Sequence, residues 1–332
     1  MAVLEVRGLT KHFPIHAGFL AKTFSGAKDK MIKAVDGVSF EVGEGEILGV
    51  AGESGCGKST TCLLLSKLHK PSGGEILFKG RNIADLDADG LRQYRKDVQM
   101  IFQDPYESLN PRFTIFDTVA EGPRALKLWP EEEIQTRVMD MLADVGLRPE
   151  EYAQRYPHQM SGGERQRAGI ACALVMKPEL VIADEPLSML DVSIRAGIMD
   201  LLKRLSTEMK FSCIYVSHDL SILSNVSQRL MIMYLGQVME IGPTDEVIAN
   251  PQHPYARALI NAVAVPDPRY RRPIPDIRGE VAQPIDPPPG CRFAGRCPAV
   301  IDACGQDPAP RFVDFGLGHR SACHLVAAGA GS

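Results

Sequence analysis

The sequence of 332 residues predicts an α/β fold with a parallel-sheet core, an antiparallel β subdomain, a helical subdomain and a small irregular C-terminal extension. One apolar, strand-like stretch runs directly into a glycine-rich loop and a helical stretch, and a second apolar stretch ends in two acidic residues. Because open α/β sheets bind ligands at the carboxyl ends of their strands, both features indicate a site at one edge of the sheet. A proline-rich composition near the C-terminus predicts the extension.

The glycine-rich loop fits the pattern G-x-x-x-x-G-K-[ST] from Gly52 to Ser59. It follows the strand-like residues 46–51 and precedes the helical stretch 60–68, which is the context that the motif requires. Inward-pointing N–H groups and the positive end of the helix favour phosphate there, so we expect Lys58 to reach the β- and γ-phosphates and Ser59 to hold Mg²⁺. The residues expected to bind the nucleotide are Gly52, Ser54, Gly55, Cys56, Gly57, Lys58, Ser59 and Thr60.

The second apolar stretch, residues 180–185, is closed by Asp184 and Glu185. We expect Asp184 to orient Mg²⁺ through water and Glu185 to polarise the attacking water as general base. A solvated strand end is the alternative, which the second acid and the following Pro186 make weaker. The long separation from Lys58 leaves room for an inserted subdomain, which a minimal GTPase or kinase core would lack.

The turn Met160-Ser161-Gly162-Gly163-Glu164, just ahead of the acidic strand, resembles the signature of ATP-binding cassette (ABC) ATPases. Met160 and Glu164 stand where Leu and Gln are commonest in that family. The change at Glu164 is mild, because the helix dipole favours an acid in the first turn. The resemblance implies that Ser161, Gly162 and Gly163 complete the ATP site of a facing subunit, so that the chain works as half of a pair.

Four further residues extend the resemblance. Asp191 lies in a stretch that resembles the D-loop, with Met189 where Ala is usual. His218 resembles the switch histidine that contacts the γ-phosphate, and Gln103 resembles the glutamine that senses Mg²⁺ and couples to the membrane partner. Phe13 stands where the family keeps an aromatic that stacks on adenine. Taken singly, His218 or Gln103 would more often be structural or solvated, but their order along the chain favours the functional interpretation.

The resemblance implies a P-loop NTPase built as an ABC cassette, with a RecA-like parallel sheet, within residues 1–250. The helical subdomain is expected at about 104–178. The patterns agree, because residues 34–42 alternate with period two, as an antiparallel strand with one wet face does. Residues 131–145 carry apolar side chains on one side only, which predicts a helix facing a core.

After about residue 250 the composition changes, and 13 of the 24 prolines lie between Pro251 and Pro310. The stretch 250–255 and a following cysteine cluster resemble the C-terminal extension of ATPases that serve oligopeptide and dipeptide importers. Residues 102–112 resemble the second of that family's two ATPase subunits. We therefore divide the chain into a cassette at 1–250 and an extension at 251–332. ATPases for nickel, glutathione or sugars would carry similar residues and remain an alternative.

The extension contains four cysteines, Cys291, Cys297, Cys304 and Cys323. Few large apolar residues surround them, so a module this small needs a cross-link or a bound metal to be stable. A reducing compartment disfavours disulfides, whereas four thiolates can hold a [4Fe–4S] cluster or a structural zinc. The spacing lacks a C-x₂-C knuckle, which weakens the case for Zn²⁺. Some members of the importer family carry an iron–sulfur cluster at such a pattern, so the resemblance favours [4Fe–4S], with Zn²⁺ and unmetallated thiols as alternatives.

The resemblance implies an ATPase that binds ATP and Mg²⁺ and energises import of dipeptides or oligopeptides through two integral membrane permeases. A paralogous ATPase is the expected partner, a homodimer the alternative, and an extracytoplasmic solute-binding protein acts indirectly. Soluble ABC ATPases of DNA repair, chromosome organisation or translation form a different class, but they usually carry two cassettes, long coiled coils or zinc modules inside the cassette. The sequence shows one cassette and no heptads.

The charge balance and the absence of long apolar stretches bear on location. The formal net charge of −4 does not indicate a nucleic-acid partner. The N-terminal residues lack a basic segment followed by an apolar one, so we expect no signal peptide. No apolar stretch approaches the roughly 18–20 residues of a membrane span. We therefore expect a peripheral protein on the cytoplasmic face of the inner membrane.

Overall fold

The computed structural model describes residues 2–15, 30–104, 108–263, 277–279 and 283–329. Within these residues, no helix has both the length and the apolar composition needed to cross a membrane. The chain divides into two compact units, each assembled from separate segments. The first unit consists of Met1–Leu4, Val42–Ile47 and Leu77–Val216, and the second consists of Glu5–Glu41, Leu48–Ile76 and Ser217–Ser332.

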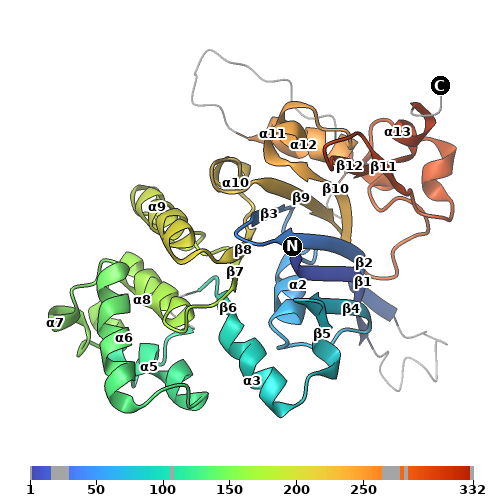
Figure 1. Ribbon diagram of the computed structural model, residues 1–332. Helices are drawn as coiled ribbons and strands as arrows, with labels where there is room; N and C mark the ends of the chain where they lie inside the picture. The colour runs from blue at the N-terminus through green and yellow to red at the C-terminus, as the bar shows by residue number, and fades with distance from the viewer. Residues whose placement is uncertain (1, 16–29, 105–107, 264–276, 280–282, 330–332) are drawn as a thin grey trace, which may run out of the picture. The chain divides into compact units, whose positions relative to one another are not determined.

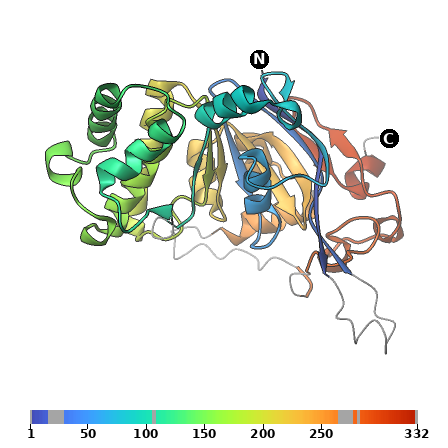
Figure 2. The same ribbon diagram turned by 90° about the horizontal axis from the view of Figure 1, so that it is seen from below.

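The first unit combines three parallel strands with most of the helices. Its elements are β5 (Arg81–Asn82), η1 (Ile83–Asp85), α3 (Ala88–Asp97), β6 (Val98–Ile101), α5 (Ile115–Ala125), α6 (Glu131–Asp144), α7 (Pro149–Tyr152), η2 (Pro157–Gln159), α8 (Gly162–Leu174), β7 (Leu180–Asp184), α9 (Val192–Met209) and β8 (Ser212–Val216). Helices α5, α6, α7 and α8 gather in one cluster (Figures 1 and 2).

The parallel strands of the first unit lie in the order β8-β7-β6. Register pairs Ile101 with Ala183 and Asp184 with Val216, so the carboxyl ends of the three strands reach the same edge. Every residue of β7 and β8 is buried, as expected for parallel strands covered on both faces. This edge is where the acidic pair predicted from the sequence lies.

Helix α6 forms for the reasons that its sequence predicts. Its first turn carries three glutamates, which the positive end of the helix dipole favours. Its buried side chains are Ile134, Val138, Met141 and Leu142. Gly146, just past the end, has a φ of 77°, which terminates the helix. The predicted one-sided helix at 131–145 is therefore confirmed to within one residue.

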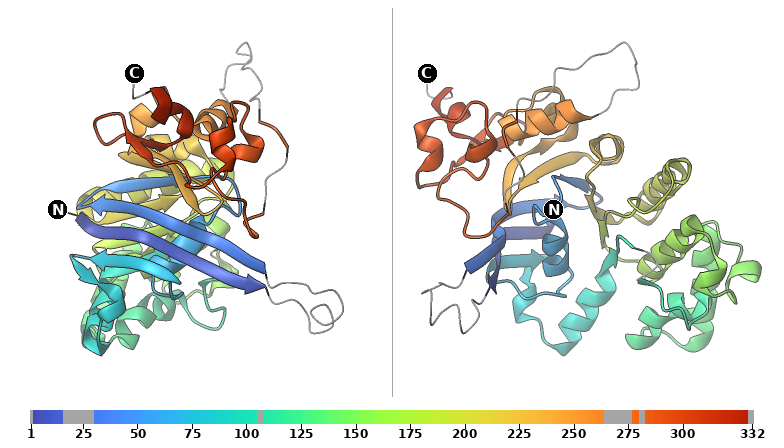
Figure 3. Two further views of the ribbon diagram at one scale, coloured as in Figure 1. Left: turned by 90° about the vertical axis from the view of Figure 1, so that its right-hand side faces the viewer. Right: turned by 180° about the vertical axis from the view of Figure 1, so that it is seen from behind.

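The second unit contains the glycine-rich loop and the whole described part of the extension. Its elements are most of β1 (Ala2–Ile15), β2 (Lys30–Gly43), β3 (Ile47–Ala51) and β4 (Gly73–Phe78), with α2 (Lys58–Leu65), α10 (Leu220–Val226), β9 (Arg229–Tyr234), β10 (Gln237–Pro243), α11 (Thr244–Ala249), α12 (Pro254–Ala262), η3 (Ala294–Arg296), η4 (Asp302–Gly305), β11 (Phe312–Asp314), β12 (Arg320–Ala322) and α13 (His324–Gly329). Strands β2, β1 and β4 are neighbours in that order, and β1 and β2 run side by side (Figure 3).

The extension joins the sheet of the second unit, where the strand order is β11-β12-β10-β9-β3. Strand β12 pairs antiparallel with β10, with Ser321 opposite Glu240. The buried carboxylate of Glu240 lies 2.7 Å from His319 Nε2 and accepts the N–H groups of Gln252 and His253. The extension is thus hydrogen-bonded to its unit through both backbone and side chains.

We predict that Leu142→Ala lowers the free energy of unfolding of the first unit by about 2–5 kcal/mol, because the substitution leaves a cavity where a fully buried side chain packs. Chemical denaturation followed by circular dichroism measures the loss. The control is Leu317→Ala, which alters a side chain 84% exposed in the second unit and is expected to stay within about 0.5 kcal/mol. Equal midpoints for both variants would contradict the assignment of this helix face to the core.

Candidate functional site

The glycine-rich loop lies between β3 and α2 and is shaped by two close approaches of the backbone. A Cβ atom at Gly52 would lie 2.3 Å from the carbonyl oxygen of Met233, and one at Gly57 would lie 2.2 Å from that of Ala34. Gly57 also has a φ of 102°. Because side chains cannot occupy these positions, the loop can curl only with glycine there.

The ammonium group of Lys58 folds back over the loop. It donates hydrogen bonds to the carbonyl oxygens of Gly52 (2.8 Å) and Glu53 (3.0 Å), and the side chain is buried. Cys56 is also buried, and burial raises the pKa of its thiol above the usual value. The thiol therefore stays neutral, which agrees with a small side chain that only fills space. Of the other predicted loop residues, the structure places Ser54, Gly55 and Ser59 at the surface, and Gly57 and Thr60 half-buried.

Two more predicted residues belong to the second unit. His218 is exposed in the turn before α10, and the preceding Ser217 donates its N–H to the carbonyl oxygen of Val50 at 3.1 Å. This bond ties the His218 turn to β3, the strand that leads into the loop. Phe13 is half-buried on β1, with the Lys11 ammonium 4.9 Å from its ring centroid and the His69 ring edge-on at 6.1 Å.

The remaining predicted residues belong to the first unit. Asp184, the last residue of β7, is buried, and Glu185 follows it half-buried. Glu185 has a φ of 46°, and its N–H donates to the carbonyl oxygen of Val216 at 3.0 Å. Gln103 is exposed just after β6, at the same edge of the sheet, whereas residues 105–107 of the predicted 102–112 stretch lie outside the described residues. Asp191 is exposed at the start of α9.

The Ser-Gly-Gly turn begins α8, with Ser161 as its N-cap. The carboxylate of Glu164 accepts hydrogen bonds from the backbone N–H (2.7 Å) and hydroxyl (2.8 Å) of Ser161, and from the hydroxyl of Tyr152 (2.5 Å). Glu164 thus completes a capping box, which explains why an acid is accommodated here. Ser161 is exposed, whereas Gly163 is buried, where a Cβ would lie 2.8 Å from Ile194.

The four cysteines of the extension are all buried and none forms a disulfide: Cys291, Cys297, Cys304 and Cys323. The pKa of the Cys291 thiol is raised to about 11, chiefly by burial and in smaller part by the three other nearby thiols. Four neighbouring thiols, shielded from water, suit an iron–sulfur cluster or zinc as a donor set. However, no group of three or more His, Cys, Asp or Glu residues in the described part of the chain has a geometry that could hold a metal ion.

A set of contacts joins the extension to the loop, and none of them is predicted by the sequence. Arg296 forms an ion pair with Glu53 (2.7 Å), and the hydroxyl of Tyr255 accepts the N–H of Glu53 (3.0 Å). Arg292 pairs with Asp36 on β2. No local pattern could predict these contacts, because the paired residues lie about 200 or more positions apart in the sequence.

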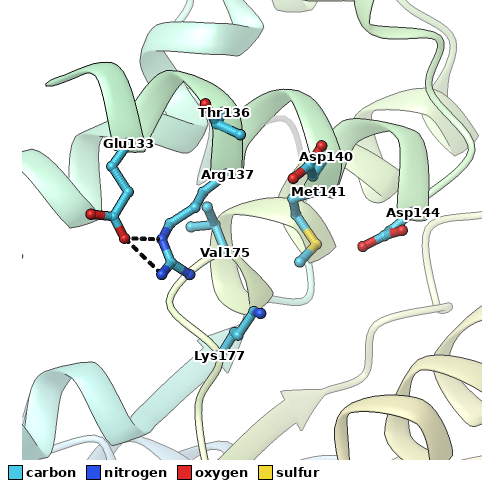
Figure 4. Close-up of a pocket in the computed structure, with 8 residues that line it drawn as sticks. All are labelled: Glu133, Thr136, Arg137, Asp140, Met141, Asp144, Val175 and Lys177. Atoms are coloured by element: carbon cyan, nitrogen blue, oxygen red, sulfur yellow. Dashed lines mark hydrogen bonds and ion pairs between the residues drawn. The ribbon is translucent and has the colours of Figure 1, made fainter. Parts of the chain in front are cut away.

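A pocket of about 420 Å³ lies on the first unit and contains none of the predicted site residues (Figure 4). It is lined by Glu133, Thr136, Arg137, Asp140, Met141, Asp144, Val175 and Lys177. Arg137 is paired with Glu133 at 2.7 Å and lies 4.1 Å from the ring centroid of Trp129, so its charge is already engaged. The pocket therefore adds no residue to the candidate site.

Comparison with known proteins gives two family matches. A family described as "ABC transporter" matches residues 35–188, and one described as "Oligopeptide/dipeptide transporter, C-terminal region" matches residues 239–304. The oligopeptide transport ATP-binding protein AppF of Bacillus subtilis is 44% identical over 326 residues, covering 97% of each chain. The oligopeptide transport ATP-binding protein OppF of Salmonella typhimurium is 46% identical over 308 residues, covering 92% of this chain and 91% of that protein.

A solved structure is also similar. It is the dimeric structure of a post-hydrolysis state of the ATP-binding cassette MJ0796 bound to ADP and Pi, with a TM-score of 0.62 and 29% identity. The similarity covers 73% of this chain and 98% of that chain. It therefore extends to nearly the whole of that cassette.

We predict that Glu164→Ala lowers the free energy of unfolding by about 0.5–2 kcal/mol at pH 7, because it removes half of the capping box of α8. The hydrogen bond from Tyr152, and then that from the Ser161 N–H, hold the pKa of Glu164 below its usual value of 4.5. The stabilisation is therefore complete above that value and is lost as the pH falls through the lowered pKa.

Denaturation midpoints at neutral and acidic pH measure this effect. The control is Glu44→Ala, an exposed glutamate of the same unit, which is expected to show little change at either pH. A difference between Glu164→Ala and the unaltered chain that persists in acid would contradict a charge-dependent cap.

Proposed function

The chain belongs to the oligopeptide and dipeptide family of ABC transporter ATP-binding proteins, and from this premise we propose how its site works and which complex it serves. It has the ABC cassette α/β fold and is an ABC-type ATPase, the ATP-binding subunit of a peptide importer. The observation that carries the assignment of the site is the loop from Gly52 to Ser59, with the buried ammonium of Lys58 held over it.

In the proposed site, the loop N–H groups and Lys58 bind the β- and γ-phosphates. Lys58 would exchange its two carbonyl acceptors for phosphate oxygens when the nucleotide binds. Ser59 would hold Mg²⁺ and Asp184 would orient it through water, with Gln103 as a further contact, and the ion would neutralise charge on the β- and γ-phosphates. Phe13 stacks on the adenine.

Hydrolysis then needs an activated water. We assign Glu185 as the general base, which accepts a proton from the water as its oxygen bonds to the γ-phosphorus. The bond from the γ-phosphorus to the bridging oxygen breaks, and ADP and phosphate leave. His218 contacts the γ-phosphate from the turn tied to β3. The left-handed backbone of Glu185 supports this role, because such conformations cluster at functional sites.

A second subunit completes the proposed site. The exposed Ser161 and the N-terminal end of the 13-residue helix α8 offer a favourable environment for the γ-phosphate of ATP held by a partner. Gly162 and Gly163 would let the partner's ATP approach the backbone closely. Asp191 would lie beside the interface between the two subunits. The dimeric state named for the MJ0796 cassette supports this arrangement. We propose a paralogous ATPase as the partner, with a homodimer as the alternative.

The complex that we propose contains two integral membrane permeases, to which this chain attaches on the cytoplasmic face of the inner membrane. An extracytoplasmic solute-binding protein would deliver the peptide. Closure of the two ATPase subunits around ATP would reorient the permeases, and hydrolysis would reopen the pair. The oligopeptide transport named for the two relatives, AppF and OppF, supports this assignment over nickel, glutathione or sugar import.

We further propose that Cys291, Cys297, Cys304 and Cys323 hold a [4Fe–4S] cluster, with Zn²⁺ as the alternative. The support is chemical alone, because four buried thiols lie near one another without disulfides. Their side chains would have to converge to bind the group, since no three of them in the described structure have a metal-binding geometry. Thiols must lose their protons to bind metal, and burial raises the pKa of three of them. Assembly of the group is therefore expected to be more favourable at alkaline pH.

For the ATPase, we predict that Glu185→Gln lowers kcat by about 10²–10⁴-fold, because an amide cannot accept the proton. MgATP should still bind and should trap the paired state. Steady-state turnover and size-exclusion chromatography with MgATP measure the two effects. Glu150→Gln, an exposed position in α7, is the control and should leave both unchanged. Turnover retained in Glu185→Gln would remove this residue from the role of base.

For the cysteines, we predict that protein purified without oxygen contains about four irons per chain and absorbs in the visible range. Metal analysis and absorbance spectroscopy measure both. Cys304→Ser should lose the iron, whereas Cys172→Ser, on α8 in the first unit, should retain it. One zinc per chain without iron would favour the alternative, and absence of both metals would leave four unmetallated thiols.

A further inference from the structure

We propose that Arg296 is a positioning residue for the glycine-rich loop from Gly52 to Ser59, called the phosphate loop from here on. The turn between Cys291 and Cys297 would thereby set the affinity of the loop for nucleotide. This inference rests on the nucleotide site proposed above and adds to it a residue from the extension. All of the contacts that carry it lie within the second unit.

The guanidinium of Arg296 grips the carboxylate of Glu53 with two nitrogens. Nη1 lies 2.7 Å from one oxygen and Nη2 lies 3.2 Å from the other, while Nη1 also lies 3.4 Å from the hydroxyl of Tyr234. The Arg296 side chain is only 11% exposed and that of Glu53 is 25% exposed. A two-point arginine–carboxylate pair with this little solvent fixes the direction of the carboxylate as well as its distance.

Glu53 is the second residue of the phosphate loop, and each of its polar groups is held. Its N–H donates to the hydroxyl of the fully buried Tyr255 at 3.0 Å. Its carbonyl oxygen accepts hydrogen bonds from the Lys58 ammonium (3.0 Å) and the Cys56 N–H (3.3 Å). The residue that Arg296 orients is therefore in direct contact with the lysine assigned to the phosphates.

The turn that carries Arg296 is itself fixed. Phe293, just before η3 (Ala294–Arg296), is fully buried, with its ring centroid 5.3 Å from those of Tyr234 and Tyr255. Tyr234 ends β9, and Tyr255 lies in the first turn of α12. Packing of these three rings fixes the backbone of the turn, so the Arg296 side chain is held next to Glu53 of the loop.

A second arginine of the same turn contacts β2, the strand next to β1. Arg292, also buried, pairs with Asp36 on β2, and Asp36 lies 3.0 Å from Nε2 of His12. His12 precedes Phe13, which is assigned to the adenine. The turn therefore contacts the phosphate side through Arg296 and the strand next to the adenine side through Asp36.

Two physical effects follow for nucleotide binding. A loop already held in its binding conformation loses less conformational freedom when phosphate binds. In addition, Arg296 neutralises a carboxylate that would otherwise repel the triphosphate. Both effects act equally on bound substrate and transition state, so they should change KM and the dissociation constant rather than kcat.

The test uses the full-length chain and measures the dissociation constant of MgATP together with steady-state turnover. Arg296→Gln is expected to weaken MgATP binding by about three- to tenfold while kcat at saturating ATP stays within about twofold. Arg296→Lys keeps the charge but loses the two-point contact, so its affinity for MgATP should lie between those of the unaltered chain and Arg296→Gln. The control is Arg311→Gln, an exposed arginine of the same extension, which should bind MgATP as the unaltered chain does.

The double variant with Glu53→Gln separates this role from a general loss of structure. Removing the uncompensated carboxylate should restore part of the binding that Arg296→Gln loses. If the double variant instead loses affinity by the product of the two single effects, or if Arg296→Gln binds normally, the inference is wrong. If Arg296→Gln does not fold, weakened MgATP binding by Glu53→Gln alone supports the pair and normal binding overturns it. Failure of the unaltered chain to bind MgATP would overturn the proposed nucleotide site itself.

Discussion

The close fit of the phosphate loop against its neighbouring strands is the constraint on which the rest of the site depends. Gly52 lies against the backbone of Met233 in β9, and Gly57 lies against that of Ala34 in β2. The N–H of Gly236, in the turn after β9, donates to the carbonyl oxygen of Cys56 at 2.9 Å. With the loop fixed at these points, the positions of Lys58 and of the helix N-terminus follow from short-range geometry.

The parts of the fold that depend on local pattern could be predicted from the sequence. The strand, loop and helix around Gly57 are contiguous, and α6 shows its buried face through the spacing of four apolar residues. The pairing of β12 with β10 could not be predicted, because three-residue strands are too short to show an alternating pattern. The contact of Arg296 with Glu53 depends on tertiary packing across most of the chain, which no sequence window contains.

The extension emerges as a structural part of the nucleotide-binding unit rather than an appended tail. Its hydrogen bonds to β10 centre on the fully buried Glu240, whose carboxylate contacts His319 and two backbone N–H groups. Its aromatic anchor, Phe293, packs beside the tyrosine that binds the loop backbone. The buried cysteines lie within this same framework. The turn between Cys291 and Cys297 therefore links the thiols to residues that contact the glycine-rich loop directly.

The backbone of Glu185 has a consequence for how this chain can evolve. A glutamate in a left-handed conformation costs about 1–3 kcal/mol, which glycine would largely avoid and asparagine would reduce. Selection for stability alone would therefore favour replacement of Glu185. On the role proposed for Glu185, glycine at this position would relieve the backbone strain but remove the base, so stability and turnover place opposite demands on this residue.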